Sequence, residues 1–265
     1  MGDFHLSKWY LDCVADDGTA IIGYWARLRW RSLALDYAAA LFAPAGAEPL
    51  QVQALRSPAA PALAGDTCTW RCDPLQLEGE WTAEAAPVRQ NLLQTPSGGI
   101  RWSIHQPRAR ARVRFGSTEI SGLGYTEELE LTIPPWRLPL DTLYWGRFLS
   151  PEHALVWLQW ELSDSPDQSR RRFAVLDGAL DEAPEITEDR LRLPGAAADV
   201  DLRAPRRLRE GHIAATVLDV IPGLVHLLPR KFRRAHESKR LSLARLQSPG
   251  KAPSEGWSIY EVVRW

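Results

Sequence analysis

Cysteine is scarce in this sequence, and the spacing of its three thiols excludes the sites that cysteines commonly build. The odd set Cys13, Cys68 and Cys72 forms no complete disulfide framework. On one strand, the Cα atoms of Cys68 and Cys72 would lie about 13 Å apart at roughly 3.3 Å per residue, which exceeds the reach of a disulfide. No paired C-x-x-C completes a zinc site. We therefore expect three reduced, structural thiols.

Motifs that bind nucleotides or metals are also absent. The chain has no Walker loop, no dinucleotide fingerprint and no G-x-S-x-G nucleophile turn. Gly122 and Gly124 lack the third glycine of the fingerprint and precede a strand instead of a helix. The six histidines show no metal-ligand spacing. We expect no metal and no cofactor, so any chemistry would rest on acids, bases and substrate positioning.

Neither charge nor hydropathy points to nucleic acid or to a membrane span. The 32 basic and 33 acidic residues leave a net charge of −1, which gives no bulk attraction to nucleic acid. The longest apolar run, residues 38–47, contains Pro44 and Gly46 and is too short to cross a bilayer. No signal peptide opens the chain, and Leu6 breaks the myristoylation pattern. We expect a soluble, cytoplasmic protein; peripheral membrane contact and the oligomeric state stay open.

Tryptophan, by contrast, is abundant, with twelve tryptophans against a single methionine. An indole ring buries a large apolar area and keeps an N–H that needs a hydrogen-bond partner. So many indoles favour a β-rich interior with wide aromatic surfaces, although core packing alone would also account for them.

Alternation of apolar and polar residues predicts an all-β protein with few helices. Residues 8–14 and 19–30 read as strands joined by a turn at 16–18. Residues 33–41 are ambiguous, because their alanines favour a helix while their larger apolar residues alternate as in a strand. A long helix is expected only there or near 230–245. The other predicted strands are 100–105, 108–115, 125–132, 154–162, 172–176, 189–193, 200–203, 213–220 and 258–265.

The segment Pro134-Pro135-Trp136 is the best candidate for a domain boundary, since successive prolines cannot lie in a central strand. We therefore predict two antiparallel β domains, residues 1–135 and 136–265, each a barrel or a sandwich. The strand predicted at the end of the second domain would close its sheet or barrel.

Two basic clusters have a plain structural explanation. The four arginines at alternate positions from Arg108 to Arg114 could pair with Glu128 and Glu130 across the sheet, at roughly 0.2–1 kcal/mol per pair. We prefer this ladder to a nucleic-acid surface because the overall charge is balanced. A second run, residues 230–245, is expected to form a solvated face. The alternative is a site for an acidic partner or a diphosphate.

The stretch from Tyr125 to Thr132 contains the strongest chemical signal. Tyr125 and Glu127 share a strand face with Leu129 and Leu131, whereas the opposite face is polar throughout. Glu127 is therefore expected to point into the protein. A buried carboxyl has a raised pKa and can hold a proton at neutral pH, which makes Glu127 a candidate general acid.

Short motifs in a fixed order resemble one known family. They are K-W-Y-L-D at 8–12, G-Y-T-E at 124–127, P-P-W-R-L-P at 134–139, Y-W-G-R-F at 144–148 and G-W-S-I-Y-E-V-V-R-W at 256–265. Together they look like the carotenoid 1,2-hydratase (hydroxyneurosporene synthase)-like family. Its lipocalin-like, or calycin, β-barrel fold is similar to that of tocopherol cyclases and certain Diels–Alderases. The resemblance covers most of the chain.

This resemblance implies two lipocalin-like β-barrel domains that hold a long apolar ligand. Members of the family hydrate, cyclise or otherwise rearrange polyenes without a cofactor. The hydratases carry an acidic residue two positions after the Tyr of a Gly-Tyr motif, a role that maps onto Tyr125 and Glu127. Where the hydratases continue with Asn-Trp-Gly, this chain has Leu129-Glu130-Leu131.

Protonation of an alkene requires a strong acid in a dry site and π faces that stabilise cationic charge. In this hypothesis Glu127 supplies the proton, and Tyr125 relays it or holds the carboxyl. Trp102 and Trp145 are candidate aromatic walls, and Trp157 is a further candidate for substrate binding.

Two more polar residues complete the candidate site. His105 could serve as a base or a hydrogen-bond donor, and Arg147 could orient a polar end of the substrate. Each has a simpler reading. Glu127 and Arg147 could form a buried ion pair, since buried charges are usually paired, and His105 could be a satisfied structural histidine.

Three functions therefore compete. The first is a cofactor-independent cyclase, isomerase or hydratase that acts on an apolar polyene, isoprenoid or polyketide-like substrate. The second is a lipocalin-like carrier of a hydrophobic molecule, since β-barrels of this size commonly enclose one ligand. The third, a purely structural protein, would require filled barrels without a pocket.

Overall fold

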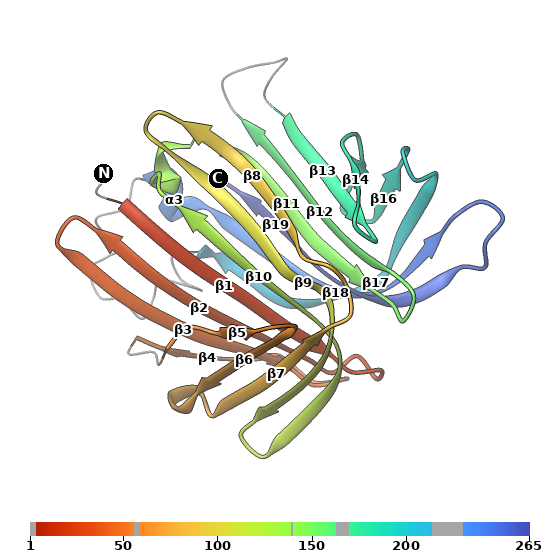
Figure 1. Cartoon of the computed structure of the whole chain (residues 1–265), viewed down its shortest axis with the longest axis horizontal. Helices are drawn as coiled ribbons and strands as arrows, with labels where there is room; N and C mark the ends of the chain where they lie inside the picture. Colours follow the sequence, from red (N-terminus) through yellow and green to blue (C-terminus); the bar gives the residue numbers. More distant parts are fainter. Residues whose placement is uncertain (1–3, 56–58, 139, 163–169, 214–229) are drawn as a thin grey trace. The chain divides into compact units, whose positions relative to one another are not determined.

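The chain folds into two antiparallel β units, Met1–Arg137 and Leu138–Trp265 (Figure 1). Each unit is described by itself. The computed structural model describes residues 4–55, 59–138, 140–162, 170–213 and 230–265. The predicted fold class, all-β with lipocalin-like domains and few helices, is confirmed. A short turn, η2 (Pro135–Arg137), contains the second proline of the proline pair and ends the first unit.

The first unit is one twisted sheet. Its strands are β1 (Phe4–Val14), β2 (Ala20–Trp30), β3 (Leu33–Ala43), β4 (Leu50–Ala54), β5 (Ala62–Ala64), β6 (Thr67–Cys72), β7 (Leu77–Ala83), β8 (Val88–Thr95), β9 (Gly98–Phe115) and β10 (Thr118–Leu131). They run in the order β4-β3-β2-β1-β10-β9-β7-β6-β5, and β8 also pairs with β9. The first strand of the unit therefore pairs with its last, β1 with β10.

The second unit repeats this topology. Its strands are β11 (Leu140–Leu149), β12 (Ala154–Leu162), β13 (Arg170–Leu176), β14 (Ala179–Asp181), β15 (Glu185–Ile186), β16 (Arg190–Leu193), β17 (Ala198–His212), β18 (His236–Gln247) and β19 (Ser254–Arg264). Their order is β14-β13-β12-β11-β19-β18-β17-β16-β15, so the first strand again pairs with the last. The last strand thus completes the sheet, as the sequence predicted.

The ambiguous alanine-rich segment is the strand β3, and the expected long helix is absent there. Ala38, Ala39 and Ala40 are fully buried, which shows that tertiary packing overrides the helix propensity of alanine. In the other segment, α3 (Arg230–Arg234) is short and β18 follows it at once. No helix in the described parts of the chain is long and apolar enough to span a membrane. The strand predicted at 213–220 lies outside the described residues, apart from Ile213.

The two strands predicted on either side of Pro107 are one strand, β9. Its register with β10 shifts twice, so that Pro107 and Arg108 face Tyr125 and His105 has no partner. Proline lacks the N–H that a ladder needs, and a bulge is the position where a strand tolerates it. The bulge therefore explains how β9 continues through Pro107.

One face of the first sheet carries an aromatic core. Trp9, Trp25, Trp70 and Trp81 are buried there, which confirms the expected aromatic, β-rich interior. The same core holds Cys13, Cys68 and Cys72 as free, buried thiols. Burial raises the pKa of the Cys68 thiol to about 12, so this cysteine is a packing residue.

The second sheet has its own core on one face. Phe148, Leu155, Trp157 and Tyr260 pack there with aliphatic residues from β16 to β18. The ring of Trp157 lies over Gly146, where an added Cβ would come within 2.2 Å of the indole.

The arginine ladder of β9 exists, but its partners differ from those predicted. The ion pairs are Arg108–Glu84, Arg110–Glu84, Arg112–Glu119 and Arg114–Glu78. The hairpin register places these arginines near the β9–β10 turn, whereas Glu128 and Glu130 lie farther along, opposite Ser103 and Arg101. Glu130 accordingly pairs with Arg101.

The basic segment 230–245 is only partly the solvated face that was predicted. Arg230 and Arg234 are exposed, but Lys239 is almost completely buried. Its ammonium forms an ion pair with Glu261 and lies 3.8 Å from Glu237 Oε1. Alternation within β18 places this lysine on an inward face, and its carboxylate partners make that burial tolerable.

Gly124 is required by the packing of its neighbours. A Cβ at this position would lie 2.5 Å from the carbonyl oxygen of Asp12 and 2.7 Å from both Ala111 Cβ and Trp81 Cδ1. The Trp81 indole crosses this point because its N–H donates a 2.7 Å hydrogen bond to the Asp12 carbonyl. The glycine of the Gly-Tyr motif thus provides room for the indole.

We predict that Gly124→Ala lowers the free energy of unfolding by about 1–3 kcal/mol, the usual cost of overpacking a core. Urea titration followed by circular dichroism measures the change. Ser121→Ala, at an exposed position of the same strand, should stay within about 0.5 kcal/mol of the wild type. Equal stability of Gly124→Ala and the wild type would contradict the packing argument.

Candidate active site

The centre of the candidate site is a hydrogen-bonded trio on β9 and β10. Glu127 Oε2 accepts a 2.6 Å hydrogen bond from the Tyr125 hydroxyl and a 2.5 Å hydrogen bond from the Trp102 indole N–H. Tyr125 and Trp102 are buried and Glu127 is half-buried. Tyr125 and Glu127 share a face by strand alternation, and the β9 register brings Trp102 beside them. The structure therefore joins three of the sequence-predicted residues.

Two further tyrosines extend this face across β1 and β2. Tyr10 lies opposite Glu127 in the β1–β10 register and opposite Tyr24 in the β1–β2 register. The Tyr10 ring centroid is 5.5 Å from that of Tyr24 and 6.0 Å from that of Tyr125, both edge-on. These rings make the face aromatic beside the Glu127 carboxyl.

Asp12 is a carboxyl that the sequence reasoning did not select. It is fully buried and lies opposite Tyr125 in the β1–β10 register. The motif K-W-Y-L-D contained the signal, because strand alternation puts Lys8, Tyr10 and Asp12 on one face. Lys8 lies there too, with its Nζ 5.6 Å from the centre of the Tyr24 ring.

His105 does not join this trio. It belongs to the β9 bulge and lies on the other face of the sheet, beside Trp9 and Glu128. Its ring stacks on the Trp9 indole at 4.7 Å and 16°, and Nε2 lies 3.6 Å from Glu128 Oε2. Consecutive strand residues face opposite sides, so Glu127 and Glu128 serve two separate clusters.

The other three predicted residues belong to the second unit. Arg147 is fully buried, and its Nη1 donates a 2.7 Å hydrogen bond to the carbonyl oxygen of Trp257. Trp145 shares the Arg147 face of β11, and the Lys239 ammonium lies 5.3 Å from the centre of its ring. Trp157 lies in the core on the opposite face, a position that fits packing. The predicted roles of all three in substrate binding stay predictions.

A cluster of buried and partly buried charged side chains lies beside Trp145. Lys239 pairs with Glu261 and Glu237, and Arg209 Nη2 donates a 2.7 Å hydrogen bond to Glu237 Oε1. Sequence reasoning missed this cluster because the basic residues of the segment were treated as a solvated run. The alternating pattern of β18 was the available signal.

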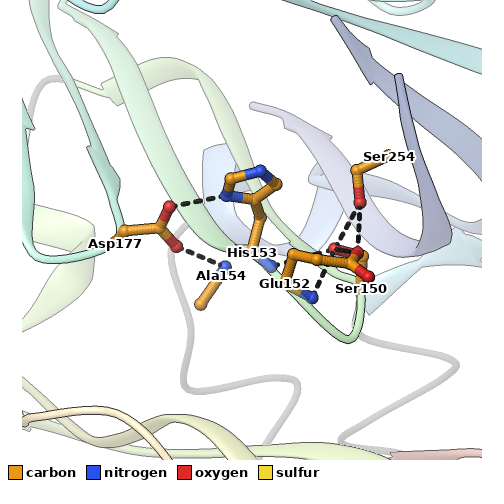
Figure 2. Close-up of polar contacts among 6 residues, drawn as sticks. All are labelled: Ser150, Glu152, His153, Ala154, Asp177 and Ser254. Carbon is orange, nitrogen blue, oxygen red and sulfur yellow. Dashed lines mark hydrogen bonds and ion pairs between the residues drawn. The ribbon is translucent and has the colours of Figure 1, made fainter. Parts of the chain in front are cut away.

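Figure 2 shows a second polar network, on the turn between β11 and β12. His153 Nδ1 lies 2.6 Å from Asp177 Oδ2, and Asp177 Oδ1 accepts the N–H of Ala154. The Ser150 hydroxyl accepts the N–H of His153 and donates to Glu152 instead of reaching the imidazole. These contacts tie turns together and do not form a nucleophile triad.

The same turn holds Glu152 as a carboxylate. The Ser254 hydroxyl donates a 2.8 Å hydrogen bond to Glu152 Oε2, and this bond is the main cause that lowers the pKa of Glu152. Within the described residues, no three histidine, cysteine, aspartate or glutamate side chains are placed to hold a metal ion.

Comparison with known proteins rests on structure. No family model and no curated protein matches the sequence. Two solved structures of CghA, one with the compound Sch210972, align with TM-scores of 0.57 and 0.58 at 12% and 13% identity. They cover 99% and 100% of this chain and 89% of CghA. An AttH-like protein from Nitrosomonas europaea aligns with a TM-score of 0.57 at 11% identity, over 97% of this chain and 92% of that one.

The chain has a lipocalin-like fold. At 11–13% identity, structural similarity establishes the fold but not the reaction or the site residues. These matches cover nearly the whole chain, as the resemblance in the sequence also did.

A pH dependence of stability follows from the Glu128 cluster. The contact with His105, and after it the 2.8 Å hydrogen bond from the Ser7 hydroxyl, lowers the pKa of Glu128 below its ordinary value of 4.5, while burial opposes the shift. A carboxyl with a lowered folded-state pKa stabilises the fold above its unfolded-state pKa. That contribution is lost as the pH falls through the folded-state value.

We therefore predict that Glu128→Gln destabilises the protein by at most about 1 kcal/mol near pH 6. This difference from the wild type should shrink as the pH falls below 4.5. Urea unfolding at pH 6, 4.5 and 3.5 measures it. A difference that stays constant over this range would mean that the charge of Glu128 does not stabilise the fold.

Proposed function

We propose that the protein is a cofactor-independent enzyme that acts on an apolar polyene, isoprenoid or polyketide-like molecule by acid/base-assisted cyclisation, isomerisation or hydration. Glu127 is the proposed acid. The observation that carries the proposal is the convergence of the Tyr125 hydroxyl and the Trp102 N–H on one oxygen of the Glu127 carboxyl.

The geometry favours an oriented proton donor. The Tyr125 hydroxyl and the Trp102 N–H both donate to Oε2 of Glu127, and these two hydrogen bonds orient the carboxyl. Tyr125 and Trp102 are themselves locked by burial, which keeps the carboxyl in one position. The rings of Tyr10 and Tyr24 present π electrons on the same face, and such faces stabilise the cationic charge that alkene protonation creates. The proposed acid, the residues that orient it and the aromatic rings thus come from four neighbouring strands, β2, β1, β10 and β9.

The fold comparison supports a small-molecule function. CghA, whose fold this chain shares, has been solved with the compound Sch210972. We extend from it only that this fold can hold an organic molecule of that kind. The choice among cyclisation, isomerisation and hydration depends on the substrate, which the proposal leaves open.

The alternative function is a carrier of a hydrophobic molecule. The same aromatic face would bind an apolar ligand without chemistry, and the Tyr125–Glu127–Trp102 bonds would then be structural. Trp157 packs in the core of the second unit, so indoles in this chain also contribute to packing.

Native mass spectrometry of the purified protein after incubation with an organic extract of its source cells separates the two functions. For an enzyme, we expect a retained apolar compound that is released as an isomer or with the added mass of one water. Release of the compound unchanged, with no isomer detected by chromatography, would support the carrier.

With the substrate identified in this way, we predict that Glu127→Gln lowers turnover at least about 100-fold, the low end of what a general acid contributes. The amide keeps the shape of the side chain but cannot donate an acidic proton. Steady-state kinetics measures the loss, and the thermal midpoint should remain close to that of the wild type.

Glu130→Gln is the matched control. This glutamate lies on the same strand but on the opposite face, where it pairs with Arg101, so turnover should not change. Wild-type turnover of Glu127→Gln would exclude the acid role, and unfolding of that variant would make the residue structural. Tyr125→Phe then separates positioning from proton donation, because it removes the hydroxyl bond to Glu127 and keeps the aromatic ring and the carboxyl.

A further inference from the structure

A cleft of about 590 Å³ opens in the first unit where the pairing along β9 is interrupted. Strand β7 ends at Ala83 and β8 begins at Val88, and both pair with β9 on either side of its bulge. The gap between them is lined by Leu63, Ala85 and Pro87 and by polar residues of the bulge. Volumes of this size are typical of sites for small organic molecules.

One wall of the cleft is held rigidly by Gln106. Its Nε2 donates 2.8 Å hydrogen bonds to the carbonyl oxygens of Asp66 and Trp81, and its Oε1 accepts a hydrogen bond from the Thr126 hydroxyl. All the polar atoms of this side chain are therefore used within the protein. The wall is shaped before any ligand arrives, which lowers the cost of binding.

His105, next to Gln106, is the chemically distinctive group of the cleft. Its ring lies flat on the Trp9 indole, and its side chain is 14% exposed. Nε2 is buried and faces the Glu128 carboxylate at 3.6 Å. Among the described residues, no hydrogen bond uses Nδ1, and His105 lines the cleft.

The surroundings of Nε2 determine the tautomer of a neutral His105. Glu128 is an anionic acceptor, supported by the hydroxyl of Ser7, so the imidazole proton is most stable on Nε2. Nδ1 is then the hydrogen-bond acceptor of an imidazole that lines the cleft. A ligand with a hydrogen-bond donor can pair with this acceptor.

Charges at the rim favour an uncharged ligand. Glu84 pairs with Arg108 and Arg110 at 3.4 and 2.6 Å, so its charge is compensated within the protein. The rest of the lining combines small apolar side chains with one acidic residue, Asp66, and one basic residue, Arg89, whose charges are opposite. These features favour a neutral molecule with an apolar body.

We propose that this cleft binds a neutral, largely apolar small molecule that carries a hydroxyl group, and that Nδ1 of His105 accepts the hydrogen bond from that hydroxyl. The site is separate from the one proposed for Glu127, because the two lie on opposite faces of β10. It does not depend on the proposed reaction, and each can fail without the other.

The test uses the full-length protein labelled with ¹⁵N-histidine, with 2-naphthol as the probe and 2-methoxynaphthalene as its matched control. The ether has the same ring system but no hydroxyl donor. We expect 2-naphthol to shift the Nδ1 resonance of His105 and to bind about tenfold more tightly than the ether at that resonance, as expected for one hydrogen bond.

Two variants complete the experiment. His105→Phe keeps a ring on Trp9 but removes the acceptor, so it should abolish the tenfold preference. His5→Gln removes another histidine that faces a glutamate, Glu130 at 3.5 Å, but lies outside the cleft, so the preference should persist.

The proposal is overturned if both probes bind equally, if the His105 resonance does not respond, or if His105→Phe keeps the preference. If His105→Phe does not fold, two measurements on the wild-type protein still test the proposal: the shift of the Nδ1 resonance and the ratio of the affinities for the two probes.

Discussion

The register of β10 between β1 and β9 is the constraint on which both proposed sites depend. The strand is paired on both edges, so every side chain must take one of two faces, and a slip by one residue would exchange them. Glu127 and Tyr125 therefore face the tyrosines, and Gly124 and Glu128 face the tryptophan core. The Trp81 indole, bonded to the Asp12 carbonyl over Gly124, links β7 to this register.

The bulge in β9 gives the first unit a feature that regular pairing would not allow. It accommodates Pro107, leaves His105 without a partner in the ladder and lies opposite the gap between β7 and β8. As a result, His105 lines the cleft, and its Nε2 lies 3.6 Å from Glu128 Oε2. Bulges often re-aim side chains beside functional sites, and the one at His105 separates that residue from Glu127.

The two units share one strand order but use their faces differently. In the first unit the face away from the tryptophan core carries Tyr10, Asp12 and Glu127, whereas in the second the corresponding face carries Trp145 and the buried Lys239–Glu261 pair. A buried ion pair of this kind contributes little to the net free energy of unfolding. Removal of one partner, however, is strongly destabilising, because the other charge is left buried and unpaired. Both units thus bury charged side chains on the face opposite the core, Asp12 in the first unit and Lys239 in the second.

Local pattern by itself located part of the strands, among them β1, β2, β10, β12 and β19, and it gave the face of Glu127, because alternation with period two is a property of neighbouring residues. Spacing alone indicated the free thiols. It also gave the trio in part, since Tyr125 and Glu127 are two residues apart. Only the tertiary structure decided that the alanines of β3 form a strand, that the β9 arginines pair with Glu78, Glu84 and Glu119, and that His105 leaves the Glu127 face. Each of these depends on which strands pair and in which register, and the position of His105 depends also on the β9 bulge. Both are set by contacts between segments far apart in the sequence.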